Sequence, residues 1–331
     1  MQQYVEISKD ILVEGVTIGC DVYLKSYSDG VPKYILFCRK DEPFNENRKN
    51  VLLEKNIEKL YVIPSDSHKC LIYQERNLSD ILASNTVNFV AKSQAIYHTA
   101  KNLTKGILQN VSLTDTDFHK VDYWVKHTLG FVLNDENAFS GLIRMTSHDY
   151  YTYTHLVNVA VYGLLFGKYL GLPSENLNTL GKGMLLHDVG KVDTPLGILN
   201  KAGKLTKDEF GIIMRHPEAG YNLLKDKKDI NGKPLIPIIQ HHENYDGTGY
   251  PYGIGGEEID LNGRISRIID TFDAMTTNRC YAKARNPFEA LSIMKECMKN
   301  HFDMELFREF ICFLGSGKIL TASGKKLKTF H

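Results

Sequence analysis

The feature that most constrains this chain is a set of histidine and aspartate residues carried by separate segments with helical periodicity. The set comprises His155, His187, Asp188, His216, His241, His242, Asp270 and Asp273. Adjacent residues on a helix point about 100° apart, so His241 and His242 can join one cluster only if metal ions lie between their side chains. We therefore expect a fold in which several helices bring these donors together.

The second part of the chain predicts a helical bundle. From Asp115 onward the pattern of apolar residues is wholly helical, and strand signals of period two are absent. We expect helices near residues 117–132, 151–171, 174–188, 206–225, 234–243, 258–280, 286–300 and 303–314. Helices of this length and number pack as a bundle, and the core of a bundle readily supplies a metal site.

The first part of the chain predicts a small α/β module in residues 1–77. Residues 51–63, VLLEKNIEKLYVI, indicate a helix followed by a strand, with Asn50 as the N-cap. His68 and Cys70 are two residues apart, and we interpret them as loop residues rather than metal ligands. No recognisable chemistry is carried by this module, so a regulatory or interaction role is expected.

A connecting helix is expected between the two parts. Residues 78–112 lack proline and have apolar residues at helical spacing, which predicts one long helix. Such a helix could transmit a signal, pair with a second subunit as a homodimer, or simply pack. The 331 residues are long for one core, and we expect three segments: 1–77, the connecting helix 78–114, and the helical domain 115–331.

Composition narrows the classes of partner. Forty basic and thirty-nine acidic residues give a net charge of +1, which offers no sign of a general DNA or membrane surface. The six cysteines lack CxxC spacing, so neither a zinc knuckle nor a disulfide framework is indicated, and a reducing cytoplasm is expected. No apolar stretch reaches the roughly 18 residues of a membrane span. We expect a soluble cytoplasmic protein.

Four motifs carry a resemblance to a known family. They are LLHDVGK at 185–191, RHP at 215–217, HHENYDGTGYP at 241–251 and DTFDAMTTNRCY at 270–281. Together they resemble the HD-GYP family of bacterial metal-dependent phosphodiesterases, a branch of the HD hydrolases, over roughly residues 117–315. The resemblance implies a mainly α protein, with an all-helical HD-GYP bundle after the small α/β domain. It also implies hydrolysis of cyclic-di-GMP to pGpG and onward to GMP.

The donors suffice for two divalent transition-metal ions, iron or manganese by their chemistry. We assign His155, His187, Asp188 and Asp270 to one ion, and Asp188, His216, His241 and His242 to the other. Asp188 would be shared, and each ion would keep positions for a bridging hydroxide and phosphate oxygens. An isolated core histidine is the alternative for His155, and a surface pair at a helix end is the alternative for His187 and Asp188.

Three charged residues are assigned to catalysis and phosphate binding. Lys191 lies three residues after Asp188 and could stabilise charge on the phosphoryl oxygens. Asp273 shares a helix face with Asp270 and could hold a ligand histidine or the attacking water. Arg279 has a planar guanidinium that suits a phosphate. For each of the three, a solvated charge at the surface is the alternative.

The loop within residues 241–251 that carries Gly247, Gly249, Tyr250 and Pro251, called the GYP loop here, is assigned with its surroundings to substrate binding. Gly247 and Gly249 permit positive φ and close approach to a ligand, and Tyr250 could stack on a guanine, cover the metals or pack on its own loop. The sequence departs from the family pattern at two positions. Tyr151 stands where some members carry a glutamate that helps to hold a third ion. Ala282 stands where members often carry a basic residue that holds the second phosphate, and Lys283, the next residue, is assigned to substrate binding.

Two further hypotheses remain open. The chain could be a binding module that senses cyclic-di-GMP, or docks a diguanylate cyclase of the GGDEF type through the GYP loop, without turnover. It could also be an HD hydrolase that acts on another nucleotide, including a mixed cyclic GMP-AMP. The full set of ligands favours an enzyme over a sensor, and the GYP loop favours cyclic-di-GMP.

Overall fold

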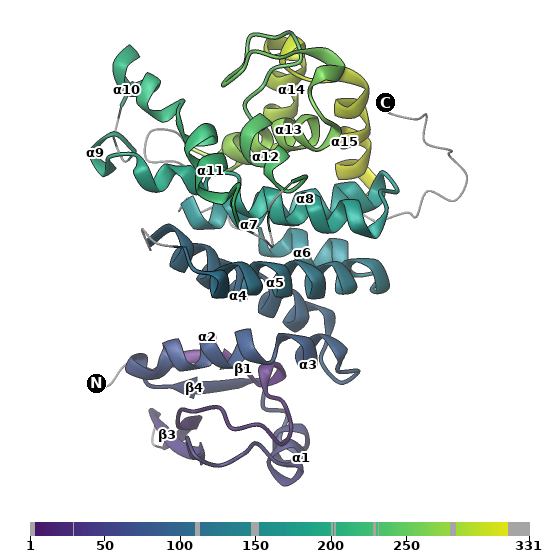
Figure 1. Ribbon diagram of the computed structural model, residues 1–331. Helices are drawn as coiled ribbons and strands as arrows, with labels where there is room; N and C mark the ends of the chain where they lie inside the picture. The colour runs from purple at the N-terminus through teal and green to yellow at the C-terminus, as the bar shows by residue number, and fades with distance from the viewer. Residues whose placement is uncertain are drawn as a thin grey trace. The chain divides into compact units, whose positions relative to one another are not determined.

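The computed structural model describes residues 4–28, 30–109, 113–146, 152–199, 201, 203–227, 230, 232–278 and 283–316. The chain divides into two compact units, Met1–Asn102 and Leu103–His331. The first unit contains a four-stranded antiparallel sheet with helices, and the described part of the second is helical (Figure 1). The predicted fold class is confirmed. The three segments that the sequence predicts, 1–77, 78–114 and 115–331, stay a prediction.

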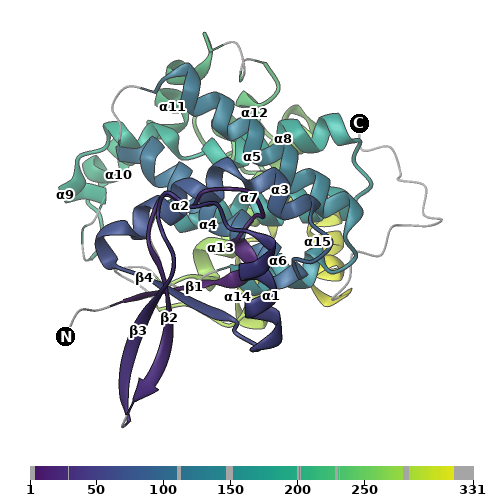
Figure 2. The same ribbon diagram turned by 90° about the horizontal axis from the view of Figure 1, so that it is seen from below.

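The sheet of the first unit has the order β1-β4-β2-β3. Its strands are β1 (Val5–Ser8), β2 (Val22–Ser28), β3 (Val31–Cys38) and β4 (Lys59–Val62). The β2–β3 hairpin extends beyond the two shorter strands (Figure 2). Because side chains alternate between the faces of a strand, Leu60 and Val62 lie on the buried face while Tyr61 lies on the other.

Two helices contribute to the core of this unit. They are α1 (Glu46–Glu54) and α2 (Ser67–Arg76), and their buried side chains include Leu52, Cys70 and Tyr73. The N-cap of α1 is Asn45, whose side chain accepts a hydrogen bond from the Arg48 amide, so the predicted cap at Asn50 is wrong. The loop interpretation of His68 and Cys70 is also wrong, because both lie in α2.

The single long helix predicted for residues 78–112 is wrong. The structure has two helices, α3 (Leu78–Ala83) and α4 (Phe89–Gln109). Ser84 ends α3 in an extended conformation, and its hydroxyl oxygen accepts a hydrogen bond from the Thr86 backbone N–H at 3.3 Å. The Asn88 side chain accepts a hydrogen bond from the Ala91 amide at 2.9 Å. These local side-chain bonds satisfy backbone groups that a continuous helix would otherwise use.

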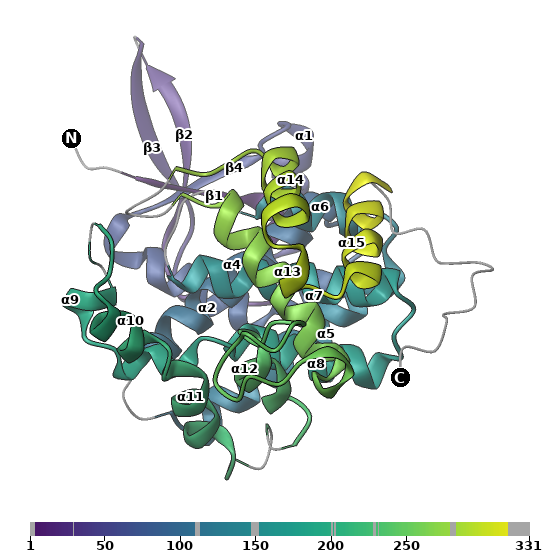
Figure 3. The same cartoon turned by 90° about the horizontal axis from the view of Figure 1, so that it is seen from above.

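The second unit packs around one apolar helix, α7 (Thr152–Tyr169). Its neighbours include α5 (Asp115–Asn134), α6 (Ala138–Met145), α8 (Ser174–Leu186), α13 (Leu261–Thr276) and α15 (Met304–Ser316). A helix that is apolar around most of its circumference must be buried, and Leu156, Val161 and Phe166 are 1% exposed or less. Further along, α13 packs against α12 (Leu235–Gln240) and α14 (Pro287–Cys297) (Figure 3).

Several helix ends differ from the prediction, and the differences fall at the histidines. Residues 206–225 form two helices, α10 (Lys207–Ile213) and α11 (His216–Leu224), because the chain turns at Met214 and Arg215 before Pro217 starts a new helix. The helix α12 ends at Gln240, so His241 and His242 lie in the following turn. Helices α6 and α9 (Leu196–Leu199) were not predicted. None of the helices in the described part of the chain is long and apolar enough to cross a membrane.

Candidate metal centre

The histidines and aspartates of the motifs converge inside the second unit. His155 lies in the first turn of α7, His187 caps the end of α8, His216 begins α11, and His241 caps the end of α12. All four are 2% exposed or less. Their side chains form two groups that could hold a metal ion, and both groups include Asp188. All four histidines therefore lie at or within one turn of a helix end.

The first group consists of His155, His187 and Asp188. The Nδ1–H of His187 donates to the Met184 carbonyl at 2.7 Å, which leaves Nε2 as an acceptor in the interior. Among the residues that the structure describes, none forms a hydrogen bond with this buried Nε2 atom. An Asp188 oxygen, Oδ2, lies 3.6 Å from it, and Oδ1 of Asp270 lies 3.8 Å from it. An acceptor nitrogen that faces two carboxylates is what a metal cation would satisfy.

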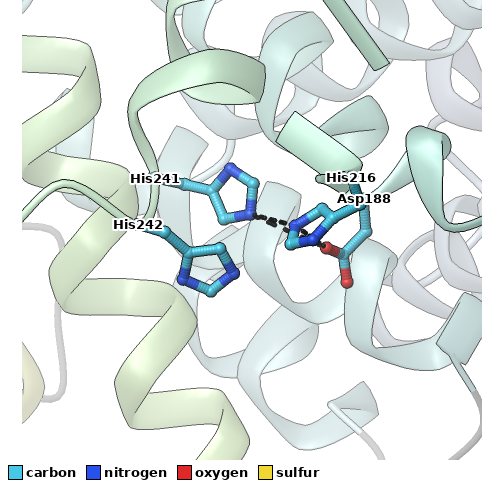
Figure 4. Close-up of side chains that lie close together, drawn as sticks. All are labelled: Asp188, His216, His241 and His242. Atoms are coloured by element: carbon cyan, nitrogen blue, oxygen red, sulfur yellow. Dashed lines mark hydrogen bonds and ion pairs between the residues drawn. The ribbon is translucent and has the colours of Figure 1, made fainter. Parts of the chain in front are cut away.

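The second group consists of Asp188, His216, His241 and His242 (Figure 4). The Nδ1–H groups of His216 and His241 donate to backbone carbonyls, so both Nε2 atoms carry lone pairs. These two Nε2 atoms are 3.1 Å apart, and Oδ1 of Asp188 is 3.1 Å from Nε2 of His216. Three acceptor atoms this close repel one another unless a proton or a cation lies between them. The donor set therefore fits a divalent transition metal.

Asp188 joins the two groups through its two carboxylate oxygens. Oδ1 faces His216 and His241, at 3.1 and 3.6 Å from their Nε2 atoms. Oδ2 faces His187 and His155, at 3.6 and 3.9 Å. Asp270 also lies between the groups, with Oδ1 3.0 Å from Nε2 of His155 and Oδ2 3.9 Å from Nδ1 of His242. This arrangement is consistent with a binuclear site in which a carboxylate is shared.

Electrostatics favour a charged carboxylate at Asp188 beside a neutral imidazole at His187. Burial raises the pKa of Asp188, but the ammonium of Lys191, 2.5 Å from Oδ2, and the neighbouring His187 hold it well below its usual range. Burial lowers the pKa of His187 to about 3. Metal binding requires deprotonated ligands, and both residues are already in that form at neutral pH. Gly190 allows the segment after Asp188 to lie close to the backbone at His216, because a Cβ at position 190 would meet the His216 carbonyl oxygen at 2.1 Å.

His155 is held by a second pair of contacts behind the cluster. Its Nδ1 lies 2.7 Å from Oδ2 of Asp273, and the other oxygen of Asp273 accepts from the Asn158 amide at 2.8 Å. Burial lowers the pKa of His155, but the hydrogen bonds with Asp270 and Asp273 raise it to about 10. Asp270 and Asp273 therefore favour a proton on each ring nitrogen of His155, including Nε2, which faces Asp270. A metal ion would displace the proton on Nε2, while Asp273 would keep the ring oriented.

The GYP loop lies against the second group. The ring of Tyr250 stacks on His242 with centroids 4.6 Å apart. Its backbone N–H donates to the His242 carbonyl, and a Cβ at Gly249 would meet the Asn244 nitrogen at 2.2 Å. Gly249 thus permits close approach to the backbone of its own loop. Of the two glycines expected to adopt positive φ, only Gly247 does so, with φ +78°.

The remaining predicted site residues are not part of the described cluster. Arg279 and Tyr151 lie outside the described residues, so the structure says nothing of the phosphate contact or of the third-ion position. Lys283 is exposed in the segment before α14. The assignment of Arg279 and Lys283 to substrate binding stays a prediction.

Two residues that were not singled out in the sequence support the centre. Asn158 orients Asp273, as described above, and it lies three residues after His155 on the same face of α7. Arg267 donates from Nε to the Asn244 side chain at 2.9 Å and from Nη1 to Thr271 at 3.1 Å. It thereby ties the GYP loop to α13. The sequence contained one signal for Asn158, because it is a polar residue one turn after the predicted ligand His155 on an otherwise apolar helix.

Replacing Asp273 with alanine is expected to weaken metal binding or activity by about 10- to 100-fold, because the ring of His155 loses the carboxylate that orients it. Metal titration of the apoprotein, followed by an assay of the reloaded protein, measures the effect. Asn158→Ala is the matched comparison, because Asn158 donates to the carboxylate oxygen that does not face His155. We expect a smaller loss there. Unchanged metal affinity in Asp273→Ala would contradict the positioning role.

Comparison with known proteins places the chain in a family. A family model described as HD domain matches residues 137–306. Cyclic di-GMP phosphodiesterase PA4108 of Pseudomonas aeruginosa is 40% identical over 184 residues, covering 56% of this chain and 44% of that protein. Response regulator RpfG of Xanthomonas campestris, also named a cyclic di-GMP phosphodiesterase, is 41% identical over 132 residues, covering 39% and 35%. The 3'3'-cGAMP-specific phosphodiesterase 2 of Vibrio cholerae is 30% identical over 230 residues, covering 67% and 42%.

This chain spans less than half the length of these three relatives. Among solved structures, Bd1817, described as a HDG"Y"P protein from Bdellovibrio bacteriovorus, matches with a TM-score of 0.66 at 19% identity. The match covers 95% of this chain and 100% of that chain, and at this identity it concerns the fold alone. The matched family region, residues 137–306, includes both groups of candidate metal ligands, which share Asp188. The chain therefore belongs to the HD domain family, as a member of its HD-GYP branch.

Proposed function

We propose that this protein is a metal-dependent phosphodiesterase that hydrolyses cyclic-di-GMP to pGpG, with GMP as the product of a second cleavage. The observation that carries the proposal is the position of Asp188, whose two oxygens face two separate groups of buried histidines. A shared carboxylate between two ions is the arrangement of two-metal phosphodiesterases. Relatives named for cyclic-di-GMP hydrolysis supply the substrate class.

The residues of the chain have distinct proposed roles. His155, His187, Asp188 and Asp270 would hold one ion, and Asp188, His216, His241 and His242 would hold the other. When bound, two divalent ions act as Lewis acids and lower the pKa of water, and this mixed imidazole and carboxylate set suits iron or manganese. The ammonium of Lys191 would stabilise negative charge on the phosphoryl group. Tyr250, on the face of His242, would stack on a guanine or exclude water.

A second cyclic dinucleotide is a specific alternative. A relative from Vibrio cholerae that matches 67% of this chain is named for 3'3'-cGAMP. The two substrates share the phosphodiester ring and differ in one base, so the metal centre by itself does not distinguish them. Selectivity would depend on the loop that carries Tyr250 and on contacts from Arg279 and Lys283.

The test is an assay of the metal-loaded full chain with cyclic-di-GMP and, separately, with 3'3'-cGAMP, with products identified by mass spectrometry. Formation of pGpG from cyclic-di-GMP supports the proposal. Preferred cleavage of 3'3'-cGAMP would support the alternative substrate. Tight binding of cyclic-di-GMP to fully loaded protein with no product would instead indicate a sensor or docking module.

We expect two metal ions per chain. The donors form two groups that share Asp188, and Tyr151 stands where some HD-GYP proteins carry a glutamate that helps to hold a third ion. Elemental analysis of anaerobically purified protein and anomalous scattering from its crystals measure the number and identity of the ions. A third well-occupied ion beside Tyr151 would contradict this count. Tyr151→Glu tests the reason, because it should permit a third ion if this side chain sets the number.

A further inference from the structure

Two buried thiols meet in the first unit of the chain. Cys20 lies just before β2, and Cys70 lies in α2, fifty positions later. Their sulfur atoms are 3.2 Å apart, and the two residues are 0% and 3% exposed. Both belong to the apolar core that also contains Val22 and Leu60. The metal centre does not involve either residue.

The geometry selects this pair among the cysteines. A disulfide has a sulfur–sulfur distance of about 2.03–2.05 Å, so these two thiols need to approach by only about 1.2 Å. Cys38 is buried in the same core, but its sulfur contacts the carbonyl oxygens of Arg39 and Glu42, each at 3.7 Å. Cys297 and Cys312 are exposed. Within the described part of the chain, Cys20 and Cys70 are the cysteines whose sulfur atoms contact each other.

We propose that Cys20 and Cys70 form a redox modification site, at which a low-molecular-weight disulfide converts the two thiols into a reversible disulfide bond. One cysteine thiolate attacks the reagent, forms a mixed disulfide and releases one reagent thiolate. The other cysteine then attacks the mixed disulfide and releases the second reagent thiolate. The two cysteine protons pass to the released thiolates, so the chain is oxidised and the reagent is reduced to two thiols.

The order of attack follows from the contact between the thiols. Either thiol can donate the hydrogen bond between the two sulfur atoms; when Cys20 donates it, the bond lowers the pKa of Cys70 and raises the pKa of Cys20. Cys70 is also the more exposed of the two, at 3%. In that arrangement, Cys70 is the thiol that attacks first. Because both are buried, the reagent reaches them only when α2 opens locally, and the reaction should be slower than at an exposed thiol.

The new bond would stabilise the first unit. It would join α2 to the segment that precedes β2 and close the chain between positions 20 and 70. A crosslink across a loop of this length restricts the unfolded chain, so the oxidised protein should unfold at a higher temperature. The shift should disappear when a dithiol reductant is added. This effect requires no change at the metal centre, so it can be measured whether or not the proposed hydrolysis is found.

The experiment uses the full chain, reduced and then incubated with oxidised glutathione. Remaining thiols are alkylated under denaturing conditions, and the protein is digested with trypsin without reduction. Cys20 falls in the peptide of residues 10–25, Cys70 in residues 70–76, and Cys38 in residues 34–39. We expect residues 10–25 and 70–76 to be joined, with a mass two hydrogens below their sum, and Cys38 to be alkylated.

Variants separate the pair from the other thiols. Cys20→Ser and Cys70→Ser should each lose the joined peptide and the reductant-sensitive shift in unfolding temperature. Cys38→Ser, a buried cysteine of the same core, should keep both. Recovery of Cys20 and Cys70 as alkylated or glutathione-bound peptides from wild-type protein would overturn the proposal. So would a bond from either cysteine to Cys38. Neither outcome depends on whether a variant folds.

Discussion

Replacing Asp188 with alanine should abolish hydrolysis and remove bound metal, the largest effect that we expect from a single substitution. Its two oxygens face separate groups of histidines, so one change removes a donor from both. The buried Nε2 atoms of His216 and His241 are 3.1 Å apart and would then lack the carboxylate charge that favours a cation between them. Elemental analysis and product formation from cyclic-di-GMP measure the two losses in one preparation.

The controls for this prediction separate the charge from the fold. Asp193→Ala removes an exposed aspartate from the same 3-10 segment, Val189–Asp193, and should leave metal content and turnover unchanged. His187→Ala should resemble Asp188→Ala but affect the first group more than the second. Circular dichroism checks that each variant keeps its helices. If Asp188→Ala retained two ions and near-normal turnover, the shared position of this carboxylate would be wrong.

Replacing Lys191 with alanine should slow the chemical step by about 10²–10³, the range for losing one oriented electrostatic stabiliser. The Lys191 ammonium lies 2.5 Å from Oδ2 of Asp188, at the edge of the cluster. We expect both ions to remain bound near neutral pH and KM to change less than kcat. Steady-state kinetics on metal-replete protein distinguishes these effects.

A pH dependence accompanies this substitution. Burial raises the pKa of Asp188, and Lys191 is the strongest influence that lowers it. A carboxylate whose pKa is depressed in the folded protein binds metal until the pH falls through that pKa. Without Lys191 the pKa rises, so metal uptake should fail at a higher pH than in wild-type protein. Lys207→Ala, at an exposed lysine on α10, is the matched control. Unchanged kcat in Lys191→Ala would return this lysine to a solvated role.

The sequence alone determined the helical class of the second unit and the residue types of its centre. Helical periodicity is a local property, so the segments that became α5, α7, α8 and α13 were recognisable without any knowledge of their neighbours. Six of the seven predicted ligands lie in motifs that resemble the HD-GYP family, and the seventh, His155, was assigned because those motifs are present. The structure places all seven within or beside the two groups.

Only the tertiary structure decided how these residues meet. The sequence predicted His241 and His242 inside a helix, whereas α12 ends at Gln240 and both lie in the turn. Periodicity continues past a helix end, because an end depends on capping and on the packing of the next segment. The division of the Asp188 oxygens between two groups likewise depends on how α11 packs against the 3-10 segment Val189–Asp193 that follows Asp188.

The pairing of Cys20 with Cys70 shows the same limit in the first unit. Cysteine spacing gave no sign of it, because the two residues are fifty positions apart and neither belongs to a motif. Contacts at this separation follow from how α2 packs on the sheet, and a sequence pattern of local period contains no information on that packing. The tie between Arg267 and Asn244 was missed for the same reason, since a loop and a helix meet there only in the folded chain.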